Sequence, residues 1–360
     1  MPAPPETVAP RLDWPDFARG ASIVMVVLLH LFLLHYLYFF YGFPGSDVVN
    51  AVVDATLPLR MPLFFLVSGY LAARAVQRPW RAVLRPRVLL LVYLYLVWVV
   101  VNAVFDVLRE QFGQGGPVDV PRFLLDNLLW PQTTLWYLYA LLLFFVVARL
   151  TRWVPVLPLV VAAAVLSVVG TTFFDGLPQH LLRSLVFYLL AARAPQLIDL
   201  LVRRSGWAVT TVTGVLAVGL TALYVATFAD LGLLLAAGVA SVAFAVQVSV
   251  RVAAHPLAAP VRYLGRHTLA IFLVHPFVFI LANDLLLARP GVAEWMRDHD
   301  LVVIAYPWVL LAATLAACVG VEAVARRVGL GWFFALPSRT GTAGAAGSPG
   351  AVTDGPGSPR

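Results

Sequence analysis

The segment RGASIVMVVLLH places Arg19 at one end of an apolar run and His30 at the other. Eleven residues of α-helix turn by roughly 1100°, about 20° from three full rotations, so the two side chains project from one helical face. They lie roughly 16 Å apart along the axis, which puts the imidazole deep in the apolar segment and the arginine at its rim. An imidazole, with an ordinary pKa of about 6.5, can accept a proton near neutral pH. His30 is therefore a candidate general base, and the alternative is a hydrogen bond to a neighbouring helix.

A second deep histidine, His275, lies nine residues beyond Arg266. The helical rise puts it about 13 Å from the same rim, at a depth similar to that of His30. An ionisable group at the centre of a membrane span costs at least about 2.5 kcal/mol, so it needs a partner, a wet cavity or a function. We expect His275 either to take part in the chemistry or to brace His30.

An arginine also occurs in an apolar segment, where Arg60 stands between Pro58 and Pro62 in LPLRMPLFF. Prolines break a helix locally, which membrane proteins tolerate where the backbone lines a cavity. Arg60 lies about 21 Å along the helix from Arg74, a little beyond the depth of the two histidines. An arginine does not become neutral by losing a proton, and a fixed cation can stabilise an oxyanion where the dielectric is low. These features predict a polar pocket at mid-membrane, with Arg60 in the catalytic set.

Four more ionisable residues occur within the apolar segments. His35 lies on a different face from the first histidine and is interpreted as a packing or interfacial residue. Asp54 and Asp284 either approach the outer headgroups or face a polar pocket. Glu322 precedes Arg326 by four residues and is expected to form an ion pair with it.

The elements that position these residues are membrane spans. Apolar residues make up 61% of the chain and charged residues 12%, with a mean hydropathy of +0.88, whereas soluble domains carry about 25% charged residues. No polar block of domain size separates the apolar segments, so we predict one all-α, polytopic transmembrane helical bundle. The ten predicted spans are 18–41, 48–73, 87–108, 134–151, 154–174, 179–195, 207–228, 231–250, 263–288 and 301–324.

The distribution of arginine predicts the orientation, because short cytoplasmic loops are rich in basic residues. All 25 basic residues are arginine, and nineteen fall on the inner side if the N-terminus is cytoplasmic. Both termini are therefore expected in the cytoplasm. The outer connection 109–133 is interpreted either as an interfacial lid or as an ordinary loop. We divide the chain into a cytoplasmic N-terminal segment 1–17, a transmembrane domain 18–325, and a disordered tail 337–360 rich in Gly, Pro, Ser and Ala.

Charge and motifs exclude several classes of function. Basic residues spread over short loops form no continuous stripe, which argues against nucleic-acid binding. A single cysteine, Cys318, provides neither a disulfide framework nor a cysteine-based metal site, and we predict no bound metal. The sequence has no GxxxxGK[ST], HExxH or GxSxG motif, which argues against ATP-driven transport and zinc hydrolysis.

One inner loop is more basic than its orientation requires, although topology alone remains the alternative explanation. Its charge suits an anionic cofactor, such as the phosphates of coenzyme A, or anionic lipid headgroups. The five arginines of this loop are Arg74, Arg78, Arg81, Arg85 and Arg87.

Four segments resemble the acyltransferase-3 family of integral membrane proteins. The first is DFARG leading to Arg19-x10-His30, which is similar to the family's R-x10-H signature. The others are MPLFFLVSGYL (61–71), LWYLYALLLFF (135–145) and LGRHTLAIFLVH (264–275), which resemble the blocks M-P-L-F-F-x-x-S-G, L-W-F-L and L-G-x-x-S-L-x-I-Y-x-x-H. Thr268 replaces the usual serine of the last block, and Phe272 replaces the usual tyrosine. All four occur in order between residues 13 and about 280, as the family pattern requires.

The resemblance implies an O-acyltransferase of the cytoplasmic (inner) membrane. Such an enzyme moves an acyl group, usually acetyl, from cytoplasmic acyl-CoA to a hydroxyl of a cell-envelope carbohydrate or similar acceptor. It further implies that His30 is the catalytic base or an acyl relay, with Arg19 as its partner. Arg78 and Arg81 fit the family's R-x-x-R pattern, and Arg81 with Arg85 is the alternative pair. Some members carry an additional SGNH hydrolase-like domain, and we expect this chain to be a stand-alone form without one.

Some residues of the blocks that resemble the family have more than one interpretation. Ser68 is either an acylated nucleophile or, with Gly69, part of a small pair that lets helices approach closely. Trp136 belongs either to a substrate site or to packing, and Tyr137 is interpreted as an interface anchor. The expected partners are membrane lipids, acyl-CoA and a carbohydrate or glycosylated acceptor. The alternative function is a transporter or flippase for a lipid-linked or glycosylated molecule, which would use the same mid-membrane cavity.

Overall fold

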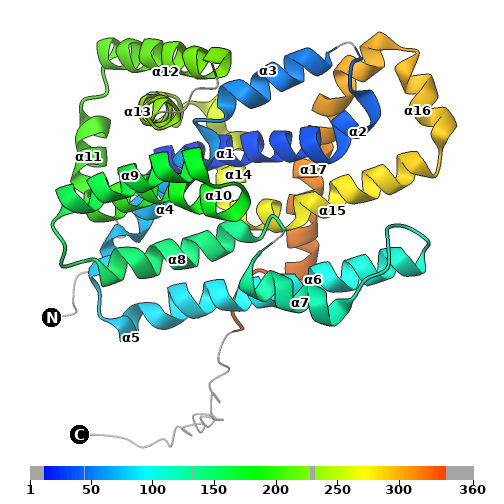
Figure 1. The fold of residues 1–360 in the computed structure, drawn as a ribbon, viewed down its shortest axis with the longest axis horizontal. Helices are drawn as coiled ribbons and strands as arrows, with labels where there is room; N and C mark the ends of the chain where they lie inside the picture. Colours follow the sequence, from blue (N-terminus) through cyan, green and yellow to red (C-terminus); the bar gives the residue numbers. More distant parts are fainter. Residues whose placement is uncertain (1–11, 44, 132, 228–231, 338–360) are drawn as a thin grey trace, which may run out of the picture.

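The computed structural model describes residues 12–43, 45–131, 133–227 and 232–337, and within these ranges the chain is all-α without a strand. Figure 1 shows the helices in sequence colours. The α-helices are α1 (Asp13–Leu31), α2 (Leu37–Phe40), α3 (Ser46–Thr56), α4 (Arg60–Gln77), α5 (Trp80–Val83), α6 (Leu90–Gln111), α7 (Val120–Leu129), α8 (Trp136–Leu150), α9 (Val156–Phe173), α10 (Gly176–Arg193), α11 (Pro195–Arg203), α12 (Trp207–Thr227), α13 (Leu233–Val252), α14 (Ala259–Arg266), α15 (Thr268–Leu287), α16 (Pro290–Arg297) and α17 (Asp300–Arg327). Two π-helical segments, η1 (Phe32–Tyr36) and η2 (Leu84–Leu89), and two 3-10 turns, η3 (Pro256–Ala258) and η4 (Gly331–Phe333), complete the described structure.

The predicted polytopic helical bundle is confirmed. Eight helical stretches in the described residues are long and apolar enough to cross a membrane, and the pair α10 and α11, bent by 80°, makes up to nine. The eight are Asp13–Phe40, Ser46–Gln77, Trp80–Gln111, Val156–Phe173, Trp207–Thr227, Leu233–Val252, Thr268–Leu287 and Asp300–Arg327. The sequence predicted ten spans; the predicted span 134–151 is not among the eight or nine, and the predicted span 179–195 is reached only if the bent pair is counted as one crossing.

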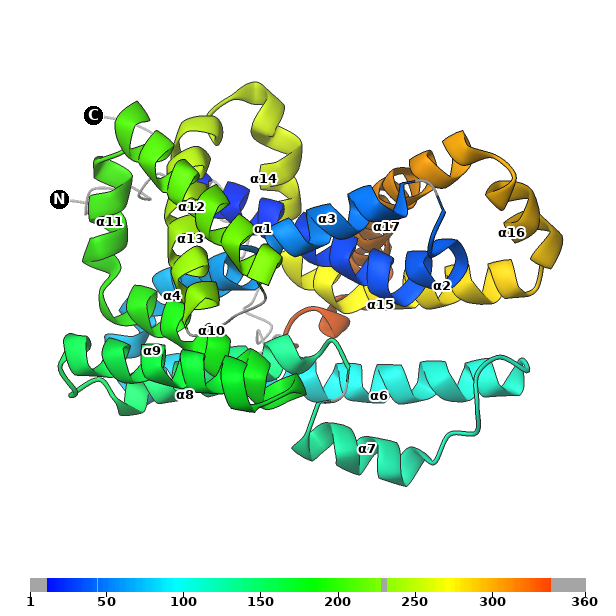
Figure 2. The ribbon, with the colours of Figure 1, turned by 45° about the horizontal axis from the view of Figure 1, so that its top comes forward.

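The predicted span 134–151 corresponds to α8, which has only 15 residues. The preceding connection 109–133 contains the helix α7. This helix runs back alongside α6 (Figures 1 and 2), and the Tyr95 hydroxyl, midway along the Trp80–Gln111 stretch, donates to the Asn127 carbonyl of α7. Helix α8 is therefore shorter than the roughly 20 residues that a full crossing needs.

The break predicted around Arg60 is confirmed. Helix α3 ends at Thr56, a turn follows, and α4 begins at Arg60. Pro58 and Pro62 lack backbone donors, so the helix cannot continue unbroken through this region. The break places the first turn of α4 inside the bundle, where Arg60 is buried.

Two glycines set the contact between the beginning and the end of the bundle. A Cβ on Gly20 of α1 would lie 1.9 Å from the Val261 carbonyl oxygen, and one on Gly265 of α14 would lie 1.7 Å from the Asp16 carbonyl oxygen. Only glycine permits such backbone contact. As a result α1, in blue, lies against α14 and α15, in yellow, although they are far apart in the sequence (Figures 1 and 2).

A third glycine joins two neighbouring helices of the bundle. A Cβ on Gly69 of α4 would lie 2.4 Å from the Tyr188 carbonyl oxygen of α10. Close helix approach, one of the two interpretations of the Ser68 and Gly69 pair, therefore holds for Gly69. The predicted tail 337–360 lies outside the described residues except for Pro337, and the cytoplasmic position of the termini stays a prediction.

Candidate active site

The two deep histidines meet. His30 on α1 and His275 on α15 have ring centroids 4.9 Å apart, and the His30 Nδ1 lies 2.9 Å from the His275 Nε2. The His275 Nδ1 donates to the Ile271 carbonyl oxygen at 2.9 Å. The glycine contacts between α1 and α14 bring the two helices to this distance, so the motif glycines position the motif histidines.

The hydrogen bonds assign the tautomers of the pair. A carbonyl oxygen only accepts, so the His275 Nδ1 carries the proton, and the Nε2 of the neutral ring accepts. The His30 Nδ1 must then donate, which leaves the His30 Nε2 with a free lone pair. His275 is fully buried, whereas His30 is only half-buried. His275 thus braces His30, and the His30 Nε2 is the atom that can accept a proton.

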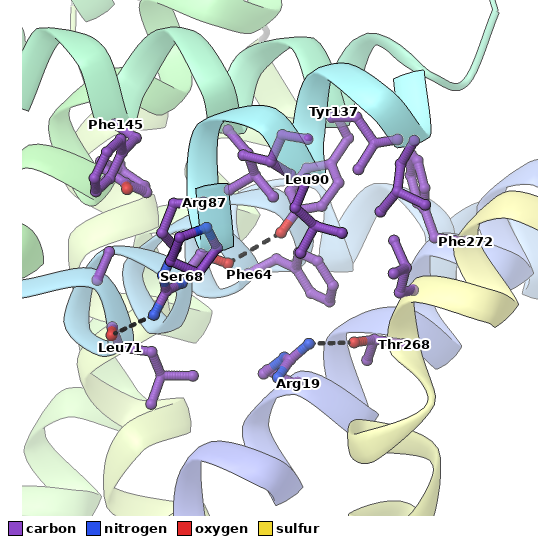
Figure 3. Close-up of a pocket in the computed structure, with 18 residues that line it drawn as sticks. Arg19, Phe64, Ser68, Leu71, Arg87, Leu90, Tyr137, Phe145, Thr268 and Phe272 are labelled. Atoms are coloured by element: carbon purple, nitrogen blue, oxygen red, sulfur yellow. Dashed lines mark hydrogen bonds between the residues drawn. The ribbon is translucent and has the colours of Figure 1, made fainter. Parts of the chain in front are cut away.

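A cavity of about 210 Å³, which we call the basic cavity, is lined by Phe272 but by neither histidine of the pair (Figure 3). Within it Arg19 donates to the Thr268 hydroxyl at 2.5 Å, and Arg87 donates to the Leu71 carbonyl oxygen at 3.3 Å. The basic cavity is lined by Arg19, Phe64, Ser68, Leu71, Ala72, Pro86, Arg87, Leu90, Leu91, Leu94, Tyr137, Leu138, Leu141, Phe145, Tyr188, Thr268, Leu269 and Phe272. Two guanidinium groups on otherwise apolar walls suit an amphipathic anion.

An aromatic ring joins the basic cavity to the histidine pair. Phe272 lines the cavity, its ring centroid is 5.0 Å from that of Tyr137, and it is 6.1 Å from that of His275. The Tyr137 hydroxyl and the Ser68 hydroxyl are 3.0 Å apart (Figure 3). A group bound in the cavity is therefore one aromatic side chain away from the histidines.

Tyr137 is not the interface anchor that the sequence suggested. Its side chain is 5% exposed and packs against Phe64 and Phe65 as well as Phe272. Aromatic residues at the end of the predicted span suggested an interface anchor. This interpretation of Tyr137 is wrong because α8 begins inside the bundle rather than at its surface. Trp136, one residue earlier, stacks near His180 of α10, with ring centroids 5.1 Å apart.

The predicted arginines divide into two groups. Arg19 lines the basic cavity, whereas Arg78, Arg81 and Arg85 are exposed and do not line it. Arg85 instead donates to the Pro337 carbonyl oxygen at 3.1 Å. The inner loop contributes Arg87 to the lining, because η2 turns this residue toward α4. Its place at the start of the following apolar run was the available signal.

Arg60 is 6% exposed, and its Nη1 donates to the Val53 carbonyl oxygen at 2.7 Å and to the Thr56 hydroxyl at 3.3 Å. These bonds satisfy backbone and side-chain acceptors at the end of α3. The guanidinium also interacts electrostatically with His30 and with Asp54. Arg60 is thus a buried cation near the histidine pair, and it does not line the basic cavity.

His180 is a site neighbour that sequence reasoning missed. It lies in the first turns of α10, near Trp136, and interacts electrostatically with Arg60. A polar residue directly after the start of an apolar helix was the only sequence signal, and it resembles an ordinary span end.

The remaining intramembrane ionisable residues have partners. His35 is fully buried and hydrogen-bonded to Asn283 and to the Tyr306 hydroxyl, the latter at 2.6 Å, so the packing interpretation is confirmed. Asp284 forms an ion pair with Arg109 at 2.7 Å. These pairs leave the two residues little freedom to take part in chemistry.

Glu322 forms the expected ion pair with Arg326 at 2.6 Å, and it also accepts a hydrogen bond from the His267 Nδ1 at 2.7 Å.

Across the described ranges, no group of three or more His, Cys, Asp or Glu residues could hold a metal ion. The polar groups around the basic cavity can transfer protons and bind anions.

Comparison with known proteins identifies the family of the chain. The chain is 26% identical over 349 residues to the inner membrane protein YcfT of Escherichia coli (strain K12), an alignment that covers 90% of this chain and 96% of YcfT. No solved structure matches the chain significantly. The model of the acyltransferase-3 family, described as an acyltransferase domain, matches residues 12–323 and so includes the histidine pair and the basic cavity. The chain therefore belongs to the acyltransferase-3 family.

Proposed function

We propose that this membrane acyltransferase moves an acyl group, in the first instance acetyl, from cytoplasmic acyl-CoA to a hydroxyl of a cell-envelope carbohydrate or similar acceptor. The observation that carries the proposal is the His30 and His275 pair, connected through Phe272 to the basic cavity, in a chain of this family. Similarity to an inner membrane protein supports placement in the cytoplasmic (inner) membrane.

His30 acts as the base in this scheme. Its free Nε2 takes the proton of the acceptor hydroxyl while the hydroxyl oxygen attacks the thioester carbonyl carbon. The tetrahedral intermediate then expels the coenzyme A thiolate, the C–S bond breaks, and the thiolate takes the proton from the His30 imidazolium. His275 acts through its bond to the His30 Nδ1, which fixes the tautomer that leaves Nε2 free.

The arginines have separate roles in the proposal. Arg19 and Arg87 line the basic cavity and bind anionic groups of acyl-CoA. Arg78, Arg81 and Arg85 are exposed on the same basic segment and attract the cofactor toward the cavity. Arg60 stabilises the oxyanion, which its burial near His30 supports.

Three motif residues support the site rather than react. Ser68 bonds to Tyr137 and shapes the basic cavity, while Gly69 holds α4 against α10. Trp136 packs beside His180 near the outer part of the site. This assignment makes Ser68 a positioning group and not an acylated nucleophile.

The test is thioester consumption in membranes that contain the chain. We expect these membranes to release free coenzyme A from acetyl-CoA when an envelope glycan extract is added, and mass spectrometry to find acetylated glycans that cells without the gene lack. Movement of an intact glycolipid across vesicles without consumption of acetyl-CoA would favour a transporter or flippase and contradict the proposal.

A further inference from the structure

A second cavity, of about 530 Å³, lies between α3, α12 and α13 and shares no lining residue with the basic cavity. We call it the acidic groove. Its apolar walls are suited to a lipid-like portion of a ligand, and its polar groups are few. The groove is lined by Asp47, Asn50, Ala51, Asp54, Ala55, Leu59, Ala217, Val218, Thr221, Ala222, Val225, Ser241 and Phe244.

One face of α3 supplies the charged wall of the groove. Asp47, Asn50 and Asp54 are spaced by three and four residues, so they project from one helical face. Asp54 interacts electrostatically with the buried Arg60. The wall is rich in hydrogen-bond acceptors and carries no cation, so it repels phosphate and other anions.

Two hydroxyls face the groove from the other wall without a partner. Thr221 of α12 is 8% exposed and Ser241 of α13 is 5% exposed, and neither makes a hydrogen bond within the part of the chain that the structure describes. Thr213 on the same helix behaves differently, because its hydroxyl donates to the Val209 carbonyl oxygen at 2.8 Å. A buried hydroxyl that donates to no backbone carbonyl of its own helix is free to form a hydrogen bond with a ligand.

We propose that the acidic groove binds the acceptor, as a neutral polyol headgroup carried on an apolar chain. Sugar hydroxyls donate to the Asp and Asn oxygens of α3 and pair with the Thr221 and Ser241 hydroxyls, while the alkyl portion lies on the alanine and valine wall. The acceptor role rests on the proposed function, whereas binding of a polyol amphiphile to the groove does not.

The probe is octyl glucoside carrying a photoreactive diazirine in its alkyl chain, used on the full chain in phospholipid nanodiscs. We expect mass spectrometry to find the label on α3, α12 or α13, with excess unlabelled octyl glucoside suppressing it and octyl sulfate leaving it in place. The double variant Thr221→Val with Ser241→Ala removes two hydrogen-bonding groups with little change in shape, so the label should fall about tenfold. The matched control Thr213→Val should label as the wild type does.

Label that octyl glucoside does not suppress, label that persists in the double variant, or label confined to another apolar surface such as that around Val100 and Trp332 would overturn the proposal. The measurement uses no acyl-CoA. Groove labelling in a chain that consumes no acetyl-CoA would therefore contradict the proposed function and support the groove, whereas acetyl transfer without groove labelling would overturn the groove alone.

Discussion

The basic cavity and the acidic groove differ in the sign of their charge and in the segments of the chain that build them. The basic cavity has two arginines and is built on the segments that carry the family motifs, whereas the acidic groove has two aspartates and is built by α3, α12 and α13. Arg60 interacts electrostatically with His30 and with Asp54 of the groove. In the two proposals, this difference in charge separates the anionic thioester from the neutral alcohol before they meet.

After His30 itself, the largest effect should come from His275, its hydrogen-bonded neighbour. His275→Phe removes the acceptor for the His30 Nδ1–H, so His30 loses its preferred tautomer and kcat should fall on the order of 100-fold. His275→Gln offers an amide oxygen to the same proton and should recover most of the loss. Turnover of acetyl-CoA by the two purified variants measures this, and equal loss in both would show that the hydrogen bond is not what matters.

The next effect separates the two cavities by substrate. Arg19→Gln and Arg87→Gln each remove a charge-assisted hydrogen bond to the cofactor, so the KM for acetyl-CoA should rise about tenfold while kcat changes little. Arg122 on α7 is an exposed arginine in a surface ion pair and provides the matched control. If Arg122→Gln raised the KM as much, net charge rather than the basic cavity would bind the cofactor.

A third prediction concerns the contact that assembles the basic cavity. Gly265→Ala forces a Cβ onto the Asp16 carbonyl oxygen, so overpacking should destabilise the chain by about 1–3 kcal/mol. Gly320→Ala on α17 meets no atom within 4 Å and is the control, expected to be neutral or stabilising by about 0.5–1 kcal/mol. Thermal unfolding in detergent measures both. Equal midpoints for the two variants would contradict the close approach of α1 and α14.

The smallest effect belongs to the acidic groove. Thr221→Val removes one hydroxyl from the proposed acceptor site, so the KM for the acceptor should rise about threefold to tenfold while the KM for acetyl-CoA stays constant. Steady-state kinetics with each substrate varied in turn measures the two constants. A rise in the KM for acetyl-CoA instead would mean that the groove and the basic cavity do not divide the substrates.

The sequence predicted the common depth of the two histidines and the break before Arg60, but not which arginines line the basic cavity, because only the first two depend on local information. Helical periodicity places Arg19 and His30 on one face, and the rise per residue gives His30 and His275 similar depths. Pro58 and Pro62 predict the break before Arg60 because they lack backbone hydrogen-bond donors. The motif glycines then fix the distance between α1 and α14. At this distance the two histidines, which lie at similar depth, come into contact.

The acidic groove and the path of α7 and α8 had no such signal. Thr221 and Ser241 are ordinary residues of apolar helices, and only packing shows that their hydroxyls face a common space. Tyr137 is of a residue type that is typical of membrane interfaces, and its burial results from the start of α8 inside the bundle. Arg78 and Arg87 are equally basic in the sequence, and the π-helical turn at η2 decides which of them lines the cavity.

The central claim is that the free nitrogen of His30 is the base for acyl transfer, and one comparison tests it most directly. Purified wild-type chain and His30→Ala are incubated with acetyl-CoA labelled in the acetyl group and the glycan acceptor, and labelled product is counted, with His255→Ala as the exposed-histidine control. The account predicts a fall of about 10²-fold to 10⁴-fold for His30→Ala and none for His255→Ala. Wild-type transfer by a correctly folded His30→Ala chain would contradict it.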